Sequence, residues 1–248
     1  MTGQPKSAQI QALSQDKRMD PKHRMRIDSA VHKQGRGWFT GRLGGRPWTL
    51  SRTNRWVAAG GAVTLIALLS PLLLGLAVAV KASGPGPVFF VQKRTGYRGR
   101  SFGMFKFRTM VANAEALKES LRHLNKHGAQ SIDFKIDDDP RVTRIGRWLR
   151  RSSLDELPNL FNVVMGDMRL VGPRPTSFNA YRYKDNHLAR LSIYPGMTGL
   201  WQISGRSNID FDQRVELDLS YIAEQSLSLD LKILLKTPFK VFSGHGAS

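Results

Sequence analysis

A run of 25 residues without a charged side chain, WVAAGGAVTLIALLSPLLLGLAVAV (Trp56 to Val80), limits what this chain can fold into more than any other feature. A transmembrane helix needs about 20 consecutive apolar residues to cross the hydrocarbon core of a bilayer, and this run is long enough. It is not expected to be a secretory signal, because it starts late in the chain and no cleavage pattern follows it. The sequence therefore predicts one hydrophobic helix embedded in a membrane.

Two features indicate that this helix does not simply cross the bilayer. Basic residues flank it on both sides, Arg52 and Arg55 before it and Lys81 after it, although positive residues prefer the cytoplasmic face. Ser70-Pro71 interrupts its middle, where proline removes a helical hydrogen bond and a nearby serine can satisfy the freed backbone group. A re-entrant helix that bends at Ser70-Pro71 and returns to the same face satisfies both observations. A kinked single span is the alternative, and the pattern alone leaves both open.

The charge distribution divides the chain into three parts. The 248 residues carry a formal net charge of +19, which implies anionic partners such as nucleic acid, anionic lipid or phosphorylated substrates. Residues 1–50 are polar, basic and rich in Gly, Gln and Ser, and we expect them to form a disordered or loosely ordered arm. Residues 51–83 hold the hydrophobic helix, which we expect to be re-entrant, and residues 84–248 are expected to form a cytoplasmic domain. The chain has no Cys, which excludes disulfides and thiolate chemistry.

The part after the hydrophobic run predicts helices and one small β-hairpin. Two strand-like runs, Val88–Gln92 and Phe102–Arg108, are joined by a Gly-rich basic loop. Residues Asn113–Asn125 are expected to be helical. A basic segment around Trp148 suits a membrane interface or a solvated face, and the C-terminal segment from Ser220 also has an amphipathic helical pattern. The expected fold class is mainly α with a small β-hairpin, in a monotopic membrane protein with one re-entrant helix and interfacial amphipathic helices.

Two adjacent carboxylates, Asp155 and Glu156, follow two arginines in RRSSLDELPNLFN. Ser153 and Glu156 match a capping box, and Asp155 could itself cap a helix whose first turn holds Pro158. The same position favours chemistry, because a helix N-terminus stabilises a carboxylate anion and attracts phosphate. An ionised aspartate among phosphate-binding cations is a credible nucleophile for phosphoryl transfer, or a ligand for Mg²⁺ that bridges to substrate phosphates.

Four basic residues are candidates for binding phosphate. Arg150 lies just before the acidic pair, and GPRP fixes Arg174 between two prolines, which suits bidentate contact with phosphate. In FKFRTM, Lys106 and Arg108 are two residues apart and so share one face of a strand. Each signal is weak alone, because the polar face of a strand is usually solvated.

Taken together, the motifs resemble the bacterial sugar transferase family, the monotopic polyprenyl-phosphate phosphoglycosyl transferases. The resemblance covers about residues 51–248. It rests on the Ser-Pro-interrupted segment, FKFRTM, DPRVTRIGRWLRRSSLDELPNLFNVVMGDMRLVGPRP and PGMTGLWQISGR, in that order. The tail YIAEQSLSLDLKILLKT looks like the branch that starts exopolysaccharide repeat units.

The resemblance implies that residues 84–248 form a catalytic domain on the cytoplasmic face of the bacterial inner membrane. A sugar 1-phosphate is then moved from a UDP-sugar to undecaprenyl phosphate, and UMP is released. Asp155 would attack the β-phosphate and form a covalent phosphosugar-aspartate. Glu156 would assist, as the base that readies the lipid phosphate. Mg²⁺ would neutralise the diphosphate, with Asp155 as its ligand.

By the same resemblance, Arg150 and Arg174 lie near the sugar nucleotide. Lys106 and Arg108 match the basic pair of the family motif, without individual roles. Anionic lipids are expected partners, and a homo-oligomer is left open. The competing hypotheses are a membrane-anchored nucleic-acid-binding protein and a basic membrane scaffold. No recognisable nucleic-acid module is present, so nucleic acid is not an expected partner. The transferred sugar depends on pocket geometry and is not defined by any motif.

Overall fold

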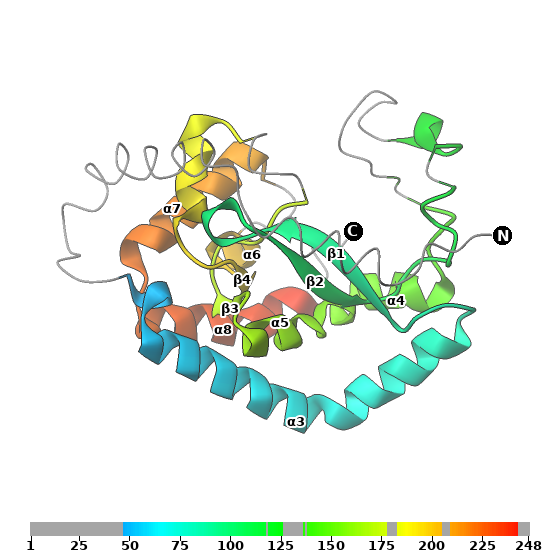
Figure 1. Cartoon of the computed structure of the whole chain (residues 1–248), viewed down its shortest axis with the longest axis horizontal. Helices are drawn as coiled ribbons and strands as arrows, with labels where there is room; N and C mark the ends of the chain where they lie inside the picture. Colours follow the sequence, from blue (N-terminus) through cyan, green and yellow to red (C-terminus); the bar gives the residue numbers. More distant parts are fainter. Residues whose placement is uncertain are drawn as a thin grey trace.

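The computed structural model describes residues 47–117, 119–125, 136, 138–177, 183–204 and 209–242. These residues are mostly helical, with two small two-stranded sheets (Figure 1). The α-helices are α3 (Arg52–Ala82), α4 (Arg144–Arg151), α5 (Asn159–Met165), α6 (Leu200–Ser204), α7 (Phe211–Glu224) and α8 (Leu227–Phe242). The strands are β1 (Phe89–Thr95), β2 (Ser101–Phe107), β3 (Arg169–Val171) and β4 (Gly196–Thr198). The mainly helical fold with a small hairpin is confirmed.

Nearly all of the arm predicted over residues 1–50 lies outside the described residues. Its last residues belong to the fold, because Trp48–Leu50 form a 3-10 turn in which Thr49 is fully buried. The Thr49 backbone N–H and hydroxyl donate to Gln225 Oε1 at 2.9 and 2.7 Å. The turn thereby ties the start of α3 to the segment between α7 and α8.

Helix α3 contains the predicted hydrophobic segment. Its 31 residues correspond to about 46 Å of helix. By length and composition it could cross a membrane, and only 11% of its most apolar 18-residue window is buried. Figure 1 shows the helix bending near its middle, and Pro71 lies inside it. Proline cannot donate to the carbonyl four residues earlier, that of Ala67. The Ser70 hydroxyl donates to this carbonyl at 2.8 Å instead, so the Ser-Pro pair bends the helix without leaving that oxygen unpaired.

Both ends of α3 pack against the same domain. Near the N-terminal end, Ala58 and Ala62 are buried against Leu160 and Val163 of α5. Near the C-terminal end, Leu76 and Val80 join a second cluster with Phe107 of β2 and Leu149 of α4. Between these contacts the helix runs along one side of the molecule, with the rest of the described chain on the other side (Figure 1).

Strands β1 and β2 form the predicted antiparallel hairpin, with Phe90 opposite Lys106. The observed β1 extends to Thr95, three residues beyond the predicted end at Gln92. The connection contains Arg98 and Gly99 with φ of 54° and 74°, the left-handed region that tight turns require. Figure 1 shows that the open end of the hairpin lies at the C-terminal end of α3, and its turn points toward α7.

The second sheet, which the sequence pattern did not predict, pairs β3 and β4 in parallel. The two strands approach so closely that a Cβ on Gly196 would lie 2.0 Å from the backbone nitrogen of Gly172. Glycine at position 196 is therefore required by the close packing of two backbones. Helices α7 and α8 cover this sheet, with Tyr221 and Ile233 fully buried in the shared cluster.

The helix predicted over Asn113–Asn125 is wrong. Apart from residue 118, which is not described, this segment consists of turns and a 3-10 segment at Arg122–Leu124. Leu117 and Leu124 are 36% and 47% exposed. Helices in proteins gain most of their stability by packing an apolar face, and this segment packs little of its apolar surface.

Candidate active site

The acidic pair lies in a 3-10 segment, Leu154–Glu156, between α4 and α5. The segment follows Ser153, whose φ of 56° puts it in the left-handed region. Ser153 makes no capping hydrogen bond, and α5 begins after Pro158, which makes none either. The capping box does not form, and Asp155 is not the cap of α5. The helix-cap explanation for the acidic pair is therefore contradicted, and its side chains are left for another role.

Glu156 is held by two cations that come from distant parts of the chain. Arg174 donates from both terminal nitrogens, with Nη1 2.7 Å from Oε2 and Nη2 bonded to Oε1. Lys106 Nζ donates to Oε1 at 2.7 Å. Burial opposes ionisation of Glu156, but Arg174 and Lys106 outweigh it and lower its pKa well below the usual range. Glu156 is therefore ionised, and both of its oxygens are engaged by cations.

Asp155 has a different environment. It is 9% exposed, and its closest described cation is Lys106, whose Nζ lies 4.0 Å from Oδ2. Burial, and then the charge of Glu156, raise the pKa of Asp155 to about 6, against the attraction of Lys106, Arg174 and Arg150. The two carboxylates are buried to a similar extent, with side chains 13% and 16% exposed, but only Glu156 is hydrogen-bonded to the cations. The raised pKa and the lack of such a bond make Asp155 the candidate reactive group of the pair.

The other predicted cations divide into two groups. Arg150 Nε donates to the Thr109 hydroxyl at 3.0 Å, and its charge acts on Asp155. Arg108, by contrast, is turned toward the end of α3. Its guanidinium donates to the carbonyls of Val80, Gly84 and Pro85 at 2.7 to 2.9 Å. Arg108 therefore fixes the hairpin to the C-terminal end of α3, and the structure does not bring it to the acidic pair.

Arg94 is a site cation that the sequence reasoning missed. Its Nη1 donates to the Pro175 carbonyl at 3.3 Å, beside Arg174. Burial, and then the charge of Arg174, lower the pKa of Arg94 to about 10, while Glu156 opposes this shift. The alternation of β1 could have identified it. Arg94 shares a strand face with Phe90, and Phe90 lies opposite Lys106, so Arg94 projects to the same side of the hairpin as Lys106. The predicted strand ended at Gln92 and so did not include it.

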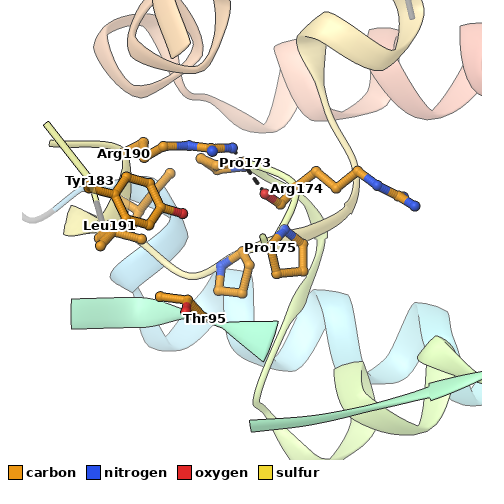
Figure 2. Close-up of a pocket in the computed structure, with 10 residues that line it drawn as sticks. Thr95, Pro173, Arg174, Pro175, Tyr183, Arg190 and Leu191 are labelled. Carbon is orange, nitrogen blue, oxygen red and sulfur yellow. Dashed lines mark hydrogen bonds between the residues drawn. The ribbon is translucent and has the colours of Figure 1, made fainter. Parts of the chain in front are cut away.

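The loop Pro173–Pro175 is anchored through its backbone by Arg190. Figure 2 shows the guanidinium of Arg190 facing the backbone carbonyl of Arg174, whose own side chain extends away from this pocket. Arg190 Nη2 donates to that carbonyl at 2.9 Å and lies 2.5 Å from Asp218 Oδ2. Both members of the Arg190–Asp218 pair are buried. Burial raises the pKa of Asp218 to about 6, although Arg190 opposes the shift. A buried ion pair therefore fixes the backbone of the loop, so the Arg174 side chain starts from a defined position.

The acidic pair also bears on the Mg²⁺ that the family resemblance implies. No group of three or more His, Cys, Asp or Glu residues that could enclose a metal occurs in the described ranges. Mg²⁺ commonly binds through one or two carboxylates together with substrate phosphates. Asp155 fits such a site as the protein ligand, because both oxygens of Glu156 are engaged by Arg174 and Lys106.

Cations gathered around two neighbouring carboxylates, on a domain packed against a long apolar helix, form an arrangement that suits the binding of phosphate. The bacterial sugar transferase family model matches residues 50–244, so the chain belongs to that family.

Three relatives illustrate the match. The chain is 45% identical over 188 residues to the undecaprenyl-phosphate galactose phosphotransferase of Salmonella typhimurium (strain LT2), covering 75% of this chain and 39% of that protein. It is 44% identical over 190 residues to the UDP-galactose-lipid carrier transferase of Erwinia amylovora, covering 75% and 40%. It is 41% identical over 173 residues to the exopolysaccharide production protein ExoY of Rhizobium meliloti (strain 1021), covering 68% and 76%. The chain thus spans about two fifths of the first two proteins and three quarters of ExoY.

Proposed function

We propose that this protein is a phosphoglycosyl transferase that moves a sugar 1-phosphate from a UDP-sugar to undecaprenyl phosphate and releases UMP. The product, a polyprenyl diphosphate sugar, would start the assembly of an exopolysaccharide or another surface glycan. The names of the relatives, which refer to undecaprenyl phosphate, UDP-galactose and exopolysaccharide, support this reaction. The observation that carries the proposal is the contrast between Glu156, which holds Arg174 and Lys106, and the buried Asp155 beside it.

In the first half-reaction, a carboxylate oxygen of Asp155 bonds to the β-phosphorus of the UDP-sugar. The bond from that phosphorus to the bridging oxygen breaks, and the oxygen leaves with UMP. The result is a phosphosugar ester of Asp155, an acyl phosphate. Lys106, Arg150 and Arg174 stabilise the charge on the phosphate oxygens, and such fixed cations supply much of the catalysis in phosphoryl transfer. Mg²⁺ bound by Asp155 and the diphosphate would supply further charge neutralisation.

In the second half-reaction, an oxygen of the lipid phosphate bonds to the same phosphorus, and the bond to Asp155 breaks and restores the carboxylate. The geometry argues against the expected role of Glu156 as a base in this step. Its pKa is lowered and its two oxygens are engaged. A phosphate monoester has a second pKa of about 6 and is mostly dianionic at neutral pH, so it needs little help from a base. We propose instead that Glu156 positions Arg174 and Lys106.

The experiment that tests the function is release of UMP from a panel of UDP-sugars by membranes that contain the protein. Without acceptor, we expect each enzyme to release at most one equivalent of UMP. Further UMP release should require added undecaprenyl phosphate, and one UDP-sugar should be preferred. Membranes with the Asp155→Asn variant are the control for other enzymes that cleave UDP-sugars. A nucleic-acid-binding protein or a scaffold would release no UMP above this control.

We further propose that α3 is re-entrant, with both ends on the cytoplasmic face of the inner membrane. Three observations support this. Both ends of α3 pack on one domain, which a helix with its ends on opposite faces could not do without carrying part of that domain across. The bend at Pro71 also needs no unpaired carbonyl at Ala67, because Ser70 donates to it. The basic flanks Arg55 and Lys81 favour the same topology.

The topology can be measured with single cysteines at Thr53 and Ser83, because the chain has no Cys of its own. We expect both to be protected from an impermeant thiol reagent in intact cells and both to react after the cells are opened. Labelling of one position from the periplasm would contradict the re-entrant helix. In a Pro71→Leu background the straightened helix could cross the bilayer, and one of the two positions should then become accessible from outside.

A further inference from the structure

One face of the β-hairpin looks toward the acidic pair. In antiparallel strands, residues directly opposite each other project to the same face, and every second residue along a strand shares it. Lys106 reaches Glu156 at 2.7 Å, which defines the face that belongs to the site. Phe90 is the cross-strand partner of Lys106, so its ring lies on this face. Gln92 and Arg94 follow on the same face of β1.

The residues on this face change in character along the strand. Phe90 is next to the open end of the hairpin, which Arg108 fastens to the carbonyls of Val80, Gly84 and Pro85 at the end of α3. Arg94 is toward the turn, beside Arg174. The face therefore has an aromatic end close to α3 and a basic end remote from it. Lys106 lies at the aromatic end, on the neighbouring strand directly across from Phe90. Figure 1 shows the hairpin running in this direction, from α3 toward α7.

The exposure of Phe90 is not explained by packing. Its neighbour Phe89 is 41% exposed, but it stacks on Phe107 with ring centroids 5.5 Å apart and meets the edge of Phe161. Phe90 is 53% exposed, and no such ring contact joins it to the described residues. An exposed aromatic ring directly beside a lysine is suited to a ligand that has an apolar chain and an anionic head.

We propose that Phe90 binds the first isoprenoid units of the acceptor lipid and so places its phosphate beside Lys106. This inference rests on the proposed function. The acceptor must bring its phosphate to the phosphosugar on Asp155 while most of its chain stays in the bilayer, and the Phe90 end of the hairpin is the end nearest the membrane helix. The soluble UDP-sugar then occupies the Arg94 and Arg174 end. The hairpin face thus separates the lipid from the nucleotide, with the acidic pair between them.

The test compares Phe90→Ser with Val91→Ser. Val91 is the next residue of β1, is 43% exposed and projects to the opposite face, so it is a matched control for loss of apolar surface. The purified enzyme in detergent is given a UDP-sugar without acceptor, and the burst of UMP is measured. Steady-state turnover is then measured against undecaprenyl phosphate. For Phe90→Ser we expect an unchanged burst and a KM for undecaprenyl phosphate raised about tenfold, the effect of losing part of a buried aromatic contact. Val91→Ser should stay within about twofold, and Phe90→Leu should restore much of the affinity.

Three results would overturn the assignment. An unchanged acceptor KM in Phe90→Ser, together with weaker binding to vesicles of bacterial phospholipid, would make Phe90 a residue that inserts into the bilayer. If Phe90→Ser lost burst and turnover equally, and both Phe90→Ser and Phe90→Leu had a lowered melting temperature, Phe90 would be a structural residue. Absence of a UMP burst from the wild-type enzyme would overturn the proposed function itself, and this outcome is distinct because it does not involve Phe90.

Discussion

Replacement of Asp155 by Asn is expected to abolish sugar-phosphate transfer while the protein folds normally. Asparagine has nearly the same shape, but an amide cannot form the acyl phosphate that the first half-reaction requires. Loss of a nucleophile reduces turnover by several orders of magnitude in enzymes that use covalent catalysis. The measurement is UMP release and lipid-linked sugar phosphate formed by wild-type and variant enzyme at equal concentration. A variant that turns over normally would remove Asp155 from the mechanism.

Thermal stability provides the control for this variant. The pKa of Asp155 is raised to about 6, mainly by burial, above the value of about 3.9 for an unfolded aspartate. The stability that this group contributes is therefore fully present below about pH 3.9 and is lost as the pH rises through about 6. In metal-free buffer at pH 7.5, the ionised carboxylate gives no such gain. The Asp155→Asn variant should then melt at the same temperature as the wild type or higher.

The covalent intermediate can be observed directly. Wild-type enzyme incubated with a UDP-sugar and Mg²⁺, without lipid acceptor, should carry a phosphosugar on the peptide that contains Asp155. Mass spectrometry of the digested protein detects this adduct, which addition of undecaprenyl phosphate should remove. Glu156→Gln should form less adduct but not lose it entirely, because the amide oxygen can still accept hydrogen bonds from Arg174 and Lys106 in part. An adduct on another residue would reassign the nucleophile.

The sequence predicted those parts of the fold that depend on local patterns. The apolar run with Ser70-Pro71 became a long bent helix, and the alternation around FKFRTM became a hairpin that delivers Lys106 to the acidic pair. Local patterns misled where the backbone departed from the expected conformation. Ser153 and Glu156 matched a capping box, but the left-handed φ of Ser153 directs the chain into a 3-10 segment instead.

Contacts between distant residues were beyond the reach of these patterns. Lys106 and Arg174 were both candidates, but their separations of 50 and 18 residues from Glu156 gave no reason to expect that one carboxylate would hold both. Arg108 was grouped with Lys106 by its spacing, yet it follows the end of β2 and donates to the Val80 carbonyl of α3 and to two carbonyls just after that helix. The buried Arg190 behind the GPRP loop carried no motif signal at all.

Arg174→Lys is expected to lower turnover strongly although it keeps the charge. Lysine lacks the planar fork with which Arg174 holds both oxygens of Glu156 and with which we propose it contacts the diphosphate. Loss of one charge-assisted hydrogen bond costs about 1.5–3 kcal/mol, which corresponds to roughly a 10- to 100-fold loss in kcat/KM for the UDP-sugar. The matched control is Arg122→Lys, because Arg122 pairs with Glu119 on the surface at 2.7 Å and should change activity little.

The anchoring of the loop makes this comparison a test of the side chain alone. The backbone at Arg174 is held by Arg190, and the adjoining Thr176 carbonyl accepts from the Thr95 backbone N–H at 3.0 Å. Neither contact uses the Arg174 guanidinium, so Arg174→Lys should leave the loop in place. Any fall in the melting temperature should then reflect only the weaker pair with Glu156. Equal activity of the Arg174→Lys and Arg122→Lys enzymes would mean that Arg174 only pairs with Glu156. A loss confined to kcat/KM for the UDP-sugar, with the acceptor KM unchanged, would place Arg174 at the nucleotide end of the site.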